Sequence, residues 1–241
     1  MKINHIPFKM PKRSFALSQE WRHLSFLHWR VDEKYILPYI PKGLELDTFN
    51  NSAYISTIPF LMKDVRPRFL PSLNYISTFP EFNIRTYVKY KNKSGVFFLT
   101  LDAQSKITCL FAPYAYGLPY RYALGSVQTK NKTYLWHSKR VSDLVELKGC
   151  CKPVGKFMKA SKGSLEEFLF ERYCLFTLLS NNLCIGYVAH KPWVYQKGQV
   201  ELESNSFTES YNLGIKNLLK PDLVHISDGL RVKTWSIEKI N

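Results

Sequence analysis

Short segments in which apolar and polar side chains alternate recur along this chain, and they restrict its fold more than any other feature. In FNIRTYVKY, Ile84 and Val88 fall on one face of a strand and Arg85 falls on the other. GVFFLTLD comes next across the turn signal NKSG, so these two segments are predicted to form a hairpin. Strands are therefore expected at 52–60, 82–90, 95–102, 120–128, 132–140, 153–160, 168–177, 183–190, 198–204 and 230–239.

Helix signals are fewer and shorter. In DEKYILPYI, Asp32 is placed to cap the first turn, and Pro38 shortens or kinks the helix. In SQEWRHL, Ser18 is a candidate N-cap. Helices are expected at 18–24, 32–40, 103–113 and 208–218. These proportions predict an α+β fold, mainly β, in which an antiparallel sheet curls into a barrel with a few short peripheral helices.

The length and the apolar content predict a single domain. The chain has 241 residues, 45% of them apolar, and shows no low-complexity linker or internal repeat. Its longest apolar runs are far shorter than the roughly 18 residues of a membrane span, so no membrane partner is expected. The basic N-terminus lacks the apolar stretch of a secretory signal. One domain over 1–241 is expected, with 1–16 as an N-terminal arm.

The cysteines indicate neither a metal centre nor a disulfide framework. There are five, with no C-x-x-C spacing, and the adjacent Cys150 and Cys151 are poorly placed to bond to each other. Reduced thiols and a cytoplasmic location are expected.

The formal net charge of +15 raises the alternative of a nucleic-acid binder. The basic residues are scattered, however, and no helix-turn-helix, zinc-finger or RNP-like segment is present. A lysine-rich solvated surface is favoured over specific nucleic-acid binding.

Several ionisable residues interrupt segments that otherwise look buried, and a buried charge must be paired. Arg172, in FLFERYCLF, is as compatible with a structural Arg–Glu pair as with chemistry. A zinc site would require three distant histidines to converge without H-x-x-H or H-x-H spacing, so no metal is expected. G-x-S-x-G, G-x-G-x-x-G and Walker patterns are absent. The polar residues in these segments are Arg22, His28, Glu81, Arg85, Arg121, Glu171, Arg172, Tyr173, His190 and His225.

The stretch GLPYRYA combines a turn with three large polar side chains. Gly117 and Pro119 punctuate the backbone, and an extended run comes after them. Tyr120 is then expected to point to the face opposite that of Arg121.

With FLHWRV, VRPRFLP, FPEFNIRTYV, GLPYRYA, FLFERY and HKPW, the chain resembles the YqjF-like family of bacterial proteins of unknown function, from about Gln19 to Trp235. That family is remotely similar to acetoacetate decarboxylase, which implies a β-barrel with an interior active site. In the decarboxylase, the first lysine of a Gly-Phe-Pro-Lys-Lys motif forms a Schiff base with the keto acid. Tyr120 stands at that lysine here and Arg121 at its cationic neighbour, so Schiff-base decarboxylation is not expected.

The resemblance also implies that Arg22 matches an arginine of the decarboxylase site and that Glu81 matches its glutamate. On this basis, we expect an interior pocket for a small carboxylate or keto acid. Tyr120 would carry the proton, Glu81 would act as general base, and Arg121 with Arg22 would clamp the anion. The weaker candidates for the same cavity are Arg85, His28, Tyr173, His190 and His225.

Three hypotheses remain open from the sequence: non-covalent acid–base catalysis, a non-catalytic binding or sensing module, and a nucleic-acid or anionic-surface binder. No cofactor is expected, and homo-oligomerisation is left open.

Overall fold

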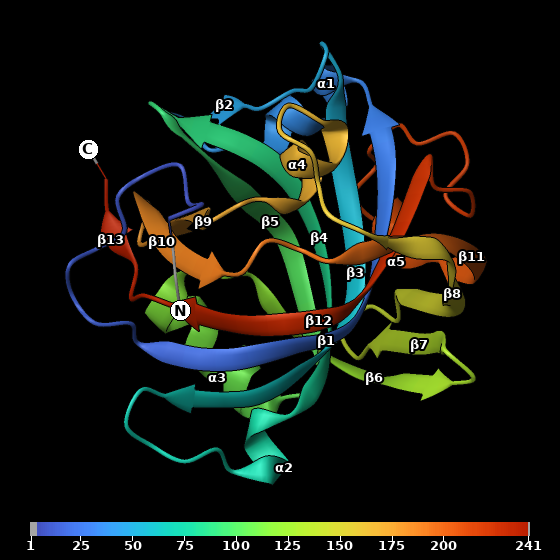
Figure 1. The fold of residues 1–241 in the computed structure, drawn as a ribbon, viewed down its shortest axis with the longest axis horizontal. Coiled ribbons are helices and arrows are strands. Elements are labelled where there is room, and N and C mark those ends of the chain that lie inside the picture. The colour runs from blue at the N-terminus through green and yellow to red at the C-terminus, as the bar shows by residue number, and fades with distance from the viewer. Residues whose placement is uncertain (1–3, 241) are drawn as a thin grey trace.

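Thirteen strands pair into one sheet within residues 4–240, the part of the chain that this computed structural model describes (Figure 1). The sheet order is β13-β10-β9-β5-β6-β7-β8-β11-β12-β1-β3-β4-β2, with further pairings of β10 with β12 and of β5 with β4. The strands are β1 Leu17–Val31, β2 Glu45–Leu46, β3 Ala53–Pro67, β4 Phe79–Tyr90, β5 Lys93–Ala103, β6 Tyr120–Lys130, β7 Thr133–Arg140, β8 Glu146–Met158, β9 Cys174–Leu179, β10 Asn182–His190, β11 Tyr195–Asn205, β12 Leu223–Thr234 and β13 Glu238–Lys239.

The mainly β prediction is confirmed, but the sheet is not purely antiparallel. β5 runs parallel to β6, where Leu101 faces Tyr120, and parallel to β9, where Val96 faces Leu175. A parallel pair needs a crossover connection rather than a tight turn. Here helix α3 supplies the crossover between β5 and β6.

The helices are short and lie at the periphery, α1 and α4 toward the top of Figure 1 and α2 and α3 toward the bottom. The longest, α3, begins after Ser105, whose hydroxyl accepts from the backbone N–H of Thr108, and ends at Gly117 in the left-handed region (φ 63°). The predicted 32–40 helix is confirmed as α1 and η1, with Asp32 as its cap. The helices are α1 Glu33–Ile36, η1 Leu37–Tyr39, α2 Asn74–Ser77, α3 Lys106–Tyr116, α4 Leu165–Phe170 and α5 Ser206–Glu209.

The helix predicted at 18–24 is wrong, because this segment is part of strand β1. It pairs with β12 on one side and β3 on the other, so that Trp21 faces both Leu230 and Met62. Two ladders of backbone hydrogen bonds outweigh the weak helix propensity of a seven-residue segment.

Two other predicted elements are only partly right. The strand predicted at 168–177 splits into helix α4 and strand β9, because Ser164 caps α4 by accepting from the N–H of Glu167. The helix predicted at 208–218 shrinks to α5, since Asn212 (φ 49°) and Gly214 (φ 67°) adopt left-handed backbone conformations.

The N-terminal arm packs onto the sheet from residue 4 onward. Ile6 is buried in a core cluster with Tyr173 and Phe176, and Phe8 and Phe15 pack against the same cluster. Residues 1–3 of the predicted arm lie outside the described residues.

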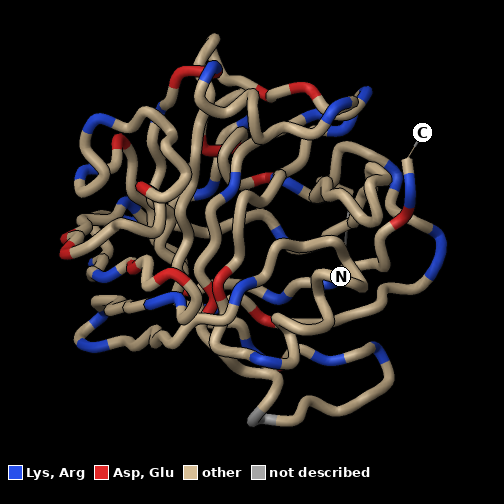
Figure 2. Tube along the Cα trace, turned by 180° about the vertical axis from the view of Figure 1, so that it is seen from behind, with Lys and Arg blue, Asp and Glu red and all other residues tan. Residues whose placement is uncertain are grey.

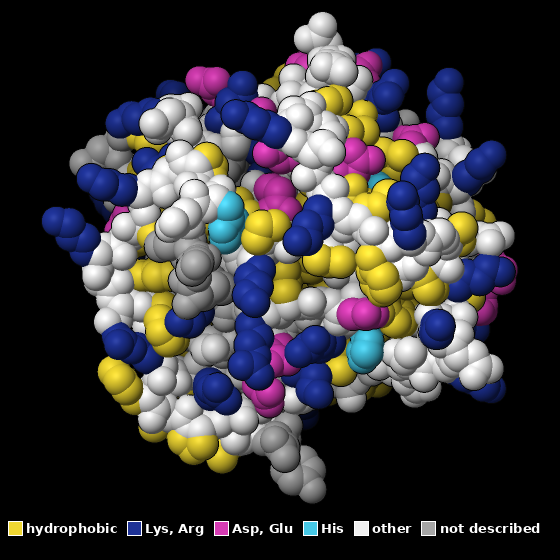
Figure 3. Space-filling view, viewed as in Figure 1, with side chains coloured by type: hydrophobic (Ala, Val, Ile, Leu, Met, Phe, Trp, Pro, Cys, Tyr) yellow, Lys and Arg dark blue, Asp and Glu magenta, His cyan; other side chains and the backbone are white. Residues whose placement is uncertain are grey.

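All five cysteines are free thiols. Within residues 4–240, no helix is long and apolar enough to cross a membrane. Lysine and arginine are spread around the chain with acidic residues among them, as Figures 2 and 3 show from opposite sides.

Candidate functional site

A cavity of about 160 Å³ is lined by residues of β1, β3, β4, β5, β6 and β10 and of helix α3. Most of its wall is apolar or aromatic, including Trp21, Phe98 and Trp193. None of the lining residues is a lysine. The ionisable or phenolic residues that line it are Glu81, Arg85, Tyr116, Tyr120, Arg172, Cys174, Tyr187 and His190.

Tyr120 and Glu81 meet at this cavity. The Tyr120 hydroxyl donates to Glu81 Oε2 at 2.7 Å. Gly117 ends α3 and Pro119 leads the chain into β6, so Tyr120 lies beside Leu101 of β5. Glu81 faces Ala103 on the other side of β5. The alternation of each strand directs both side chains inward.

Burial dominates the protonation behaviour of this pair. Glu81 is 2% exposed. Burial raises the pKa of Glu81 to about 7, although hydrogen bonds from Tyr120 and Asn83 oppose the rise. Burial also raises the pKa of Tyr120 well above its ordinary value, and the neighbouring Glu81 carboxylate adds to this rise. Near neutral pH the phenol is therefore a donor, and the carboxyl group exchanges between its two forms.

Arg85 is a buried cation without a carboxylate partner among the described residues. Its side chain lines the cavity, the residue is 9% exposed, and one Nη donates to the backbone oxygen of Leu169 at 2.9 Å. Its Nε has no hydrogen-bond partner in the protein. Every other buried arginine of residues 4–240 has a carboxylate partner: Arg140 contacts Asp102 at 2.9 Å and Arg172 contacts Asp47 at 2.6 Å.

Arg172 also lines the cavity, but its charge is balanced. Its Nε donates to the backbone oxygen of Phe168 at 2.6 Å, and its guanidinium lies over the Phe168 ring. The structural ion pair considered for Arg172 is thus present, with Asp47 rather than a glutamate as partner. His190 is 1% exposed, and its ring nitrogens lie 2.8 Å and 3.3 Å from the backbone oxygens of Lys191 and Arg172.

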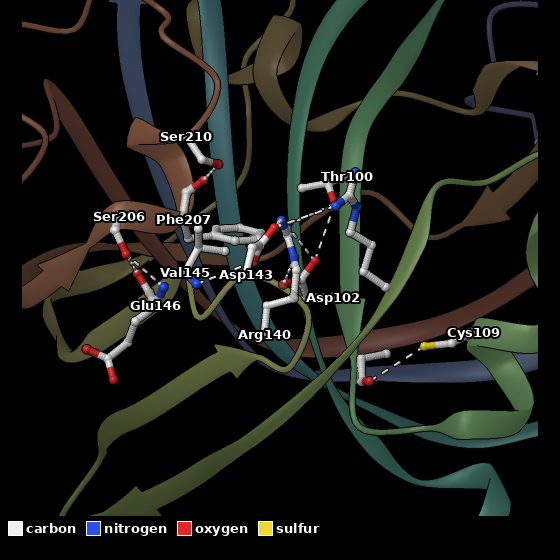
Figure 4. A network of polar contacts seen from close by, with 12 residues as sticks. Thr100, Asp102, Cys109, Arg140, Asp143, Val145, Glu146, Ser206, Phe207 and Ser210 are labelled. Atoms are coloured by element: carbon white, nitrogen blue, oxygen red, sulfur yellow. Dashed lines mark hydrogen bonds and ion pairs between the residues drawn. The ribbon is translucent and has the colours of Figure 1, made fainter.

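The two arginines expected to clamp the anion lie elsewhere. Arg121 points away from Tyr120, its side chain is 51% exposed, and it lies 3.6 Å from Asp143. Asp143 belongs to the network shown in Figure 4, in which Arg140 contacts Asp102 and Asp143 together. Arg22 is 36% exposed in its side chain and bonds to Glu20, because the alternation of β1 turns Trp21 inward instead.

The weaker candidates divide between the cavity and other places. Arg85 and His190 line it. Tyr173 is not a lining residue but stacks on His190, with ring centroids 4.6 Å apart, and its hydroxyl donates to Glu171.

His28 and His225 form a separate buried cluster rather than part of the cavity wall. Their ring centroids are 5.4 Å apart, and both rings pack against Phe170. Burial lowers the pKa of His28 well below its ordinary value and that of His225 to about 4. The described residues contain no group of three or more histidine, cysteine or acidic side chains that could hold a metal ion.

Residues 18–231 match the DUF2071 family, described as an uncharacterised conserved protein. The chain belongs to the DUF2071 family. Protein YqjF of Bacillus subtilis (strain 168), itself described as uncharacterised, is 33% identical to this DUF2071 chain over 231 residues, which is 95% of each protein. The resemblance to the YqjF-like family predicted from the sequence is confirmed.

Solved structures similar to this DUF2071 chain share the decarboxylase-like fold. Acetoacetate decarboxylase from Legionella pneumophila matches with a TM-score of 0.68 and 15% identity, over 99% of this chain and 93% of that one. The enduracididine biosynthesis enzyme MppR complexed with pyruvate matches with a TM-score of 0.60 and 11% identity, over 92% and 89%. An acetoacetate decarboxylase-like enzyme from Sphingomonas wittichii RW1 matches with a TM-score of 0.61 and 11% identity, over 98% and 99%.

Proposed function

We propose that this protein binds a small organic anion, a carboxylate or keto acid, inside the cavity, with Arg85 as the anion-binding residue. The single observation that carries this proposal is the Arg85 guanidinium at the cavity wall, which contacts the Leu169 backbone oxygen and the Tyr87 ring but no carboxylate of the described residues. Taking a charge out of water without a partner is costly, and a bound anion would offset that cost. A carboxylate would also accept a charge-assisted hydrogen bond from the Arg85 guanidinium, the cationic group of this residue at the cavity wall.

The hydrogen-bonded Tyr120 and Glu81 supply the acid–base part of the proposal. A carboxyl group with a pKa of about 7 is well suited to take or give a proton near neutral pH. The Tyr120 phenol stays protonated and donates to the carboxylate form of Glu81, and its single O–H is free to donate to an oxygen of the ligand when Glu81 is protonated. Enolisation or hydration of a keto acid is the reaction class that such a pair serves without a covalent intermediate.

Schiff-base chemistry is not part of this proposal. A tyrosine stands where the resemblance places the reactive lysine, and no lysine lines the cavity. The pyruvate in the MppR complex supports the keto-acid class as an expectation for this chain.

Nine strands are hydrogen-bonded in the order β5-β6-β7-β8-β11-β12-β1-β3-β4, and β4 at one end of this series also pairs with β5 at the other end. We infer that this closure makes a barrel and that the chain forms one domain around the cavity.

A non-catalytic binding or sensing module is the second candidate. It is favoured by the contacts of Arg172 with Asp47 and of His190 with backbone oxygens, since these contacts leave neither residue free for proton transfer. Turnover of a keto acid, measured as proton exchange at the carbon next to its keto group, separates this candidate from the enzyme.

The proposal is tested by thermal unfolding with monocarboxylates and 2-oxo acids. A ligand at about 100 times its Kd adds about 2.7 kcal/mol to the free energy of unfolding. We expect Arg85→Met to weaken binding by about 10- to 100-fold, the range of one charged hydrogen bond. Arg121→Met removes an exposed arginine from the opposite face and should leave binding unchanged. Equal binding by wild type and Arg85→Met would refute the assignment.

A further inference from the structure

We propose that the anion bound in this cavity carries a hydrophobic tail about the size of a phenyl ring, as in an arylalkanoate or a medium-chain alkanoate. This inference rests on the proposed anion site at Arg85 and adds the chemical class of its ligand.

The size of the cavity is the first support. A single water needs roughly 10–15 Å³ of such volume, and a cavity of about 150 Å³ lined by apolar side chains binds benzene. The cavity here measures about 160 Å³. A two-carbon acid would leave most of that space empty or filled with water.

The lining of the cavity is the second support. Away from Glu81 and Arg85, its walls are aromatic and aliphatic, with Trp21 stacked on Trp193 at a centroid distance of 6.2 Å and 19° between the ring planes. Water in such a region finds few hydrogen-bond partners, so an apolar group that displaces it gains affinity.

The arrangement of the polar groups is the third support. Glu81 and Arg85 both face inward from β4 and are four residues apart, which separates their Cα atoms by about 13 Å. No salt bridge joins their side chains. A ligand whose carboxylate meets Arg85 can therefore extend its chain past Glu81 along the apolar wall.

Gly186 marks an apolar part of the wall where the cavity can be narrowed. A Cβ at this position would lie 3.3 Å from side-chain atoms of Ile237 and Leu175, both of which also line the cavity. Gly186 lies on β10 and does not have a positive φ, so alanine or valine fits its backbone conformation. These substitutions reduce the tail space without changing Glu81, Tyr120 or Arg85.

Calorimetric titration of the wild-type protein with acetate, butyrate, hexanoate and 3-phenylpropionate tests the inference. Each buried methylene is worth about 0.8 kcal/mol, so affinity should rise about fourfold per added methylene until the cavity is full. Gly186→Ala and Gly186→Val should weaken hexanoate and 3-phenylpropionate binding in that order and leave acetate binding unchanged. Equal affinity along the wild-type series would overturn the inference, even where a Gly186 variant fails to fold.

Binding of the neutral alcohol 3-phenylpropanol distinguishes the inferred tail site from the proposed anion site at Arg85. If the alcohol binds as tightly as 3-phenylpropionate, the tail site stands and the anion site at Arg85 fails. If acetate binds with full dependence on Arg85 and the longer acids gain nothing, the anion site stands and the tail site fails. Absence of binding by every acid and by the alcohol would overturn both.

Discussion

The hydroxyl of Tyr120 donates to Glu81 Oε2 at 2.7 Å, which joins the first residue of β6 to the inner face of β4. This contact lowers the pKa of Glu81 against the larger effect of burial. The pair thus sets how much of the carboxyl group is ionised near neutral pH.

Tyr120→Phe should raise the pKa of Glu81 above about 7, because the carboxylate form loses a hydrogen bond while burial remains. A carboxyl titration by NMR, with the Glu81 signal assigned through its loss in Glu81→Gln, measures this change. Tyr122→Phe, two residues along the same strand, is the matched control and should leave the titration unaltered. An unchanged or lower Glu81 pKa in Tyr120→Phe would contradict the contact.

Glu81→Gln should change how stability depends on pH. The folded pKa of Glu81 is raised from 4.5 to about 7, so its favourable contribution is complete below pH 4.5 and is lost as the pH rises through about 7. Glutamine cannot ionise. The variant should therefore gain up to about 3 kcal/mol relative to wild type between pH 4.5 and pH 8.

Urea unfolding of both proteins across this pH range gives the difference directly. The exposed Glu45 on β2 provides the control, since Glu45→Gln removes a carboxyl group that solvent already surrounds. A constant difference between Glu81→Gln and wild type from pH 4.5 to pH 8 would mean that Glu81 ionises like an exposed carboxyl group.

Arg85→Met and Arg172→Met should have opposite consequences for stability, although both remove a buried arginine. Loss of Arg172 leaves the buried Asp47 carboxylate with only the more distant Lys89, 3.8 Å away, and should cost up to about 3–5 kcal/mol. Loss of Arg85 leaves no carboxylate without its cation. The backbone oxygen of Leu169 still accepts from the Tyr87 hydroxyl. Arg85→Met should therefore be as stable as wild type or more so in chemical denaturation. Equal destabilisation by the two variants would show that Arg85 has a structural partner.

The strand content was predictable from the sequence because alternation on a half-buried sheet leaves a direct pattern. The segment 82–90 behaves in this way: Ile84 packs in one core cluster while Tyr87 packs in another. The segment 18–24 could not be predicted by local rules, since its strand conformation depends on β3 and β12, which lie far along the chain.

The candidate site was partly predictable for a similar reason. Tyr120 and Glu81 were indicated by their motifs, and the strand alternation already placed Arg121 on the face opposite Tyr120. The prediction that Arg121 and Arg22 clamp the anion came from the resemblance. It overlooked that strand alternation puts Arg121 on the face opposite Tyr120. The partner that distinguishes Arg172 from Arg85 is Asp47, in a distant segment, so no local pattern could have identified Arg85 as the unpaired cation.

Borohydride with acetoacetate should leave no covalent adduct on the natural protein, because no lysine lines the cavity. Tyr120→Lys alone should be trapped weakly. Its ammonium would pair with Glu81, which favours the protonated amine, and Arg121 points away and cannot oppose this. Combining Tyr120→Lys with Glu81→Gln removes the pairing, so burial lowers the lysine pKa and trapping should increase. Mass spectrometry of the 120–130 peptide measures the adduct, and an adduct on the natural protein would contradict this prediction.

A crystal structure with 3-phenylpropionate bound is the most direct test of an anion site at Arg85. The account predicts a carboxylate oxygen about 2.7–2.9 Å from a guanidinium nitrogen of Arg85, the usual length of such a charged hydrogen bond, with the phenyl ring against the aromatic wall near Trp21 and Trp193. A carboxylate bound at the exposed Arg121, or a cavity left without ligand while the acid binds elsewhere, would contradict it.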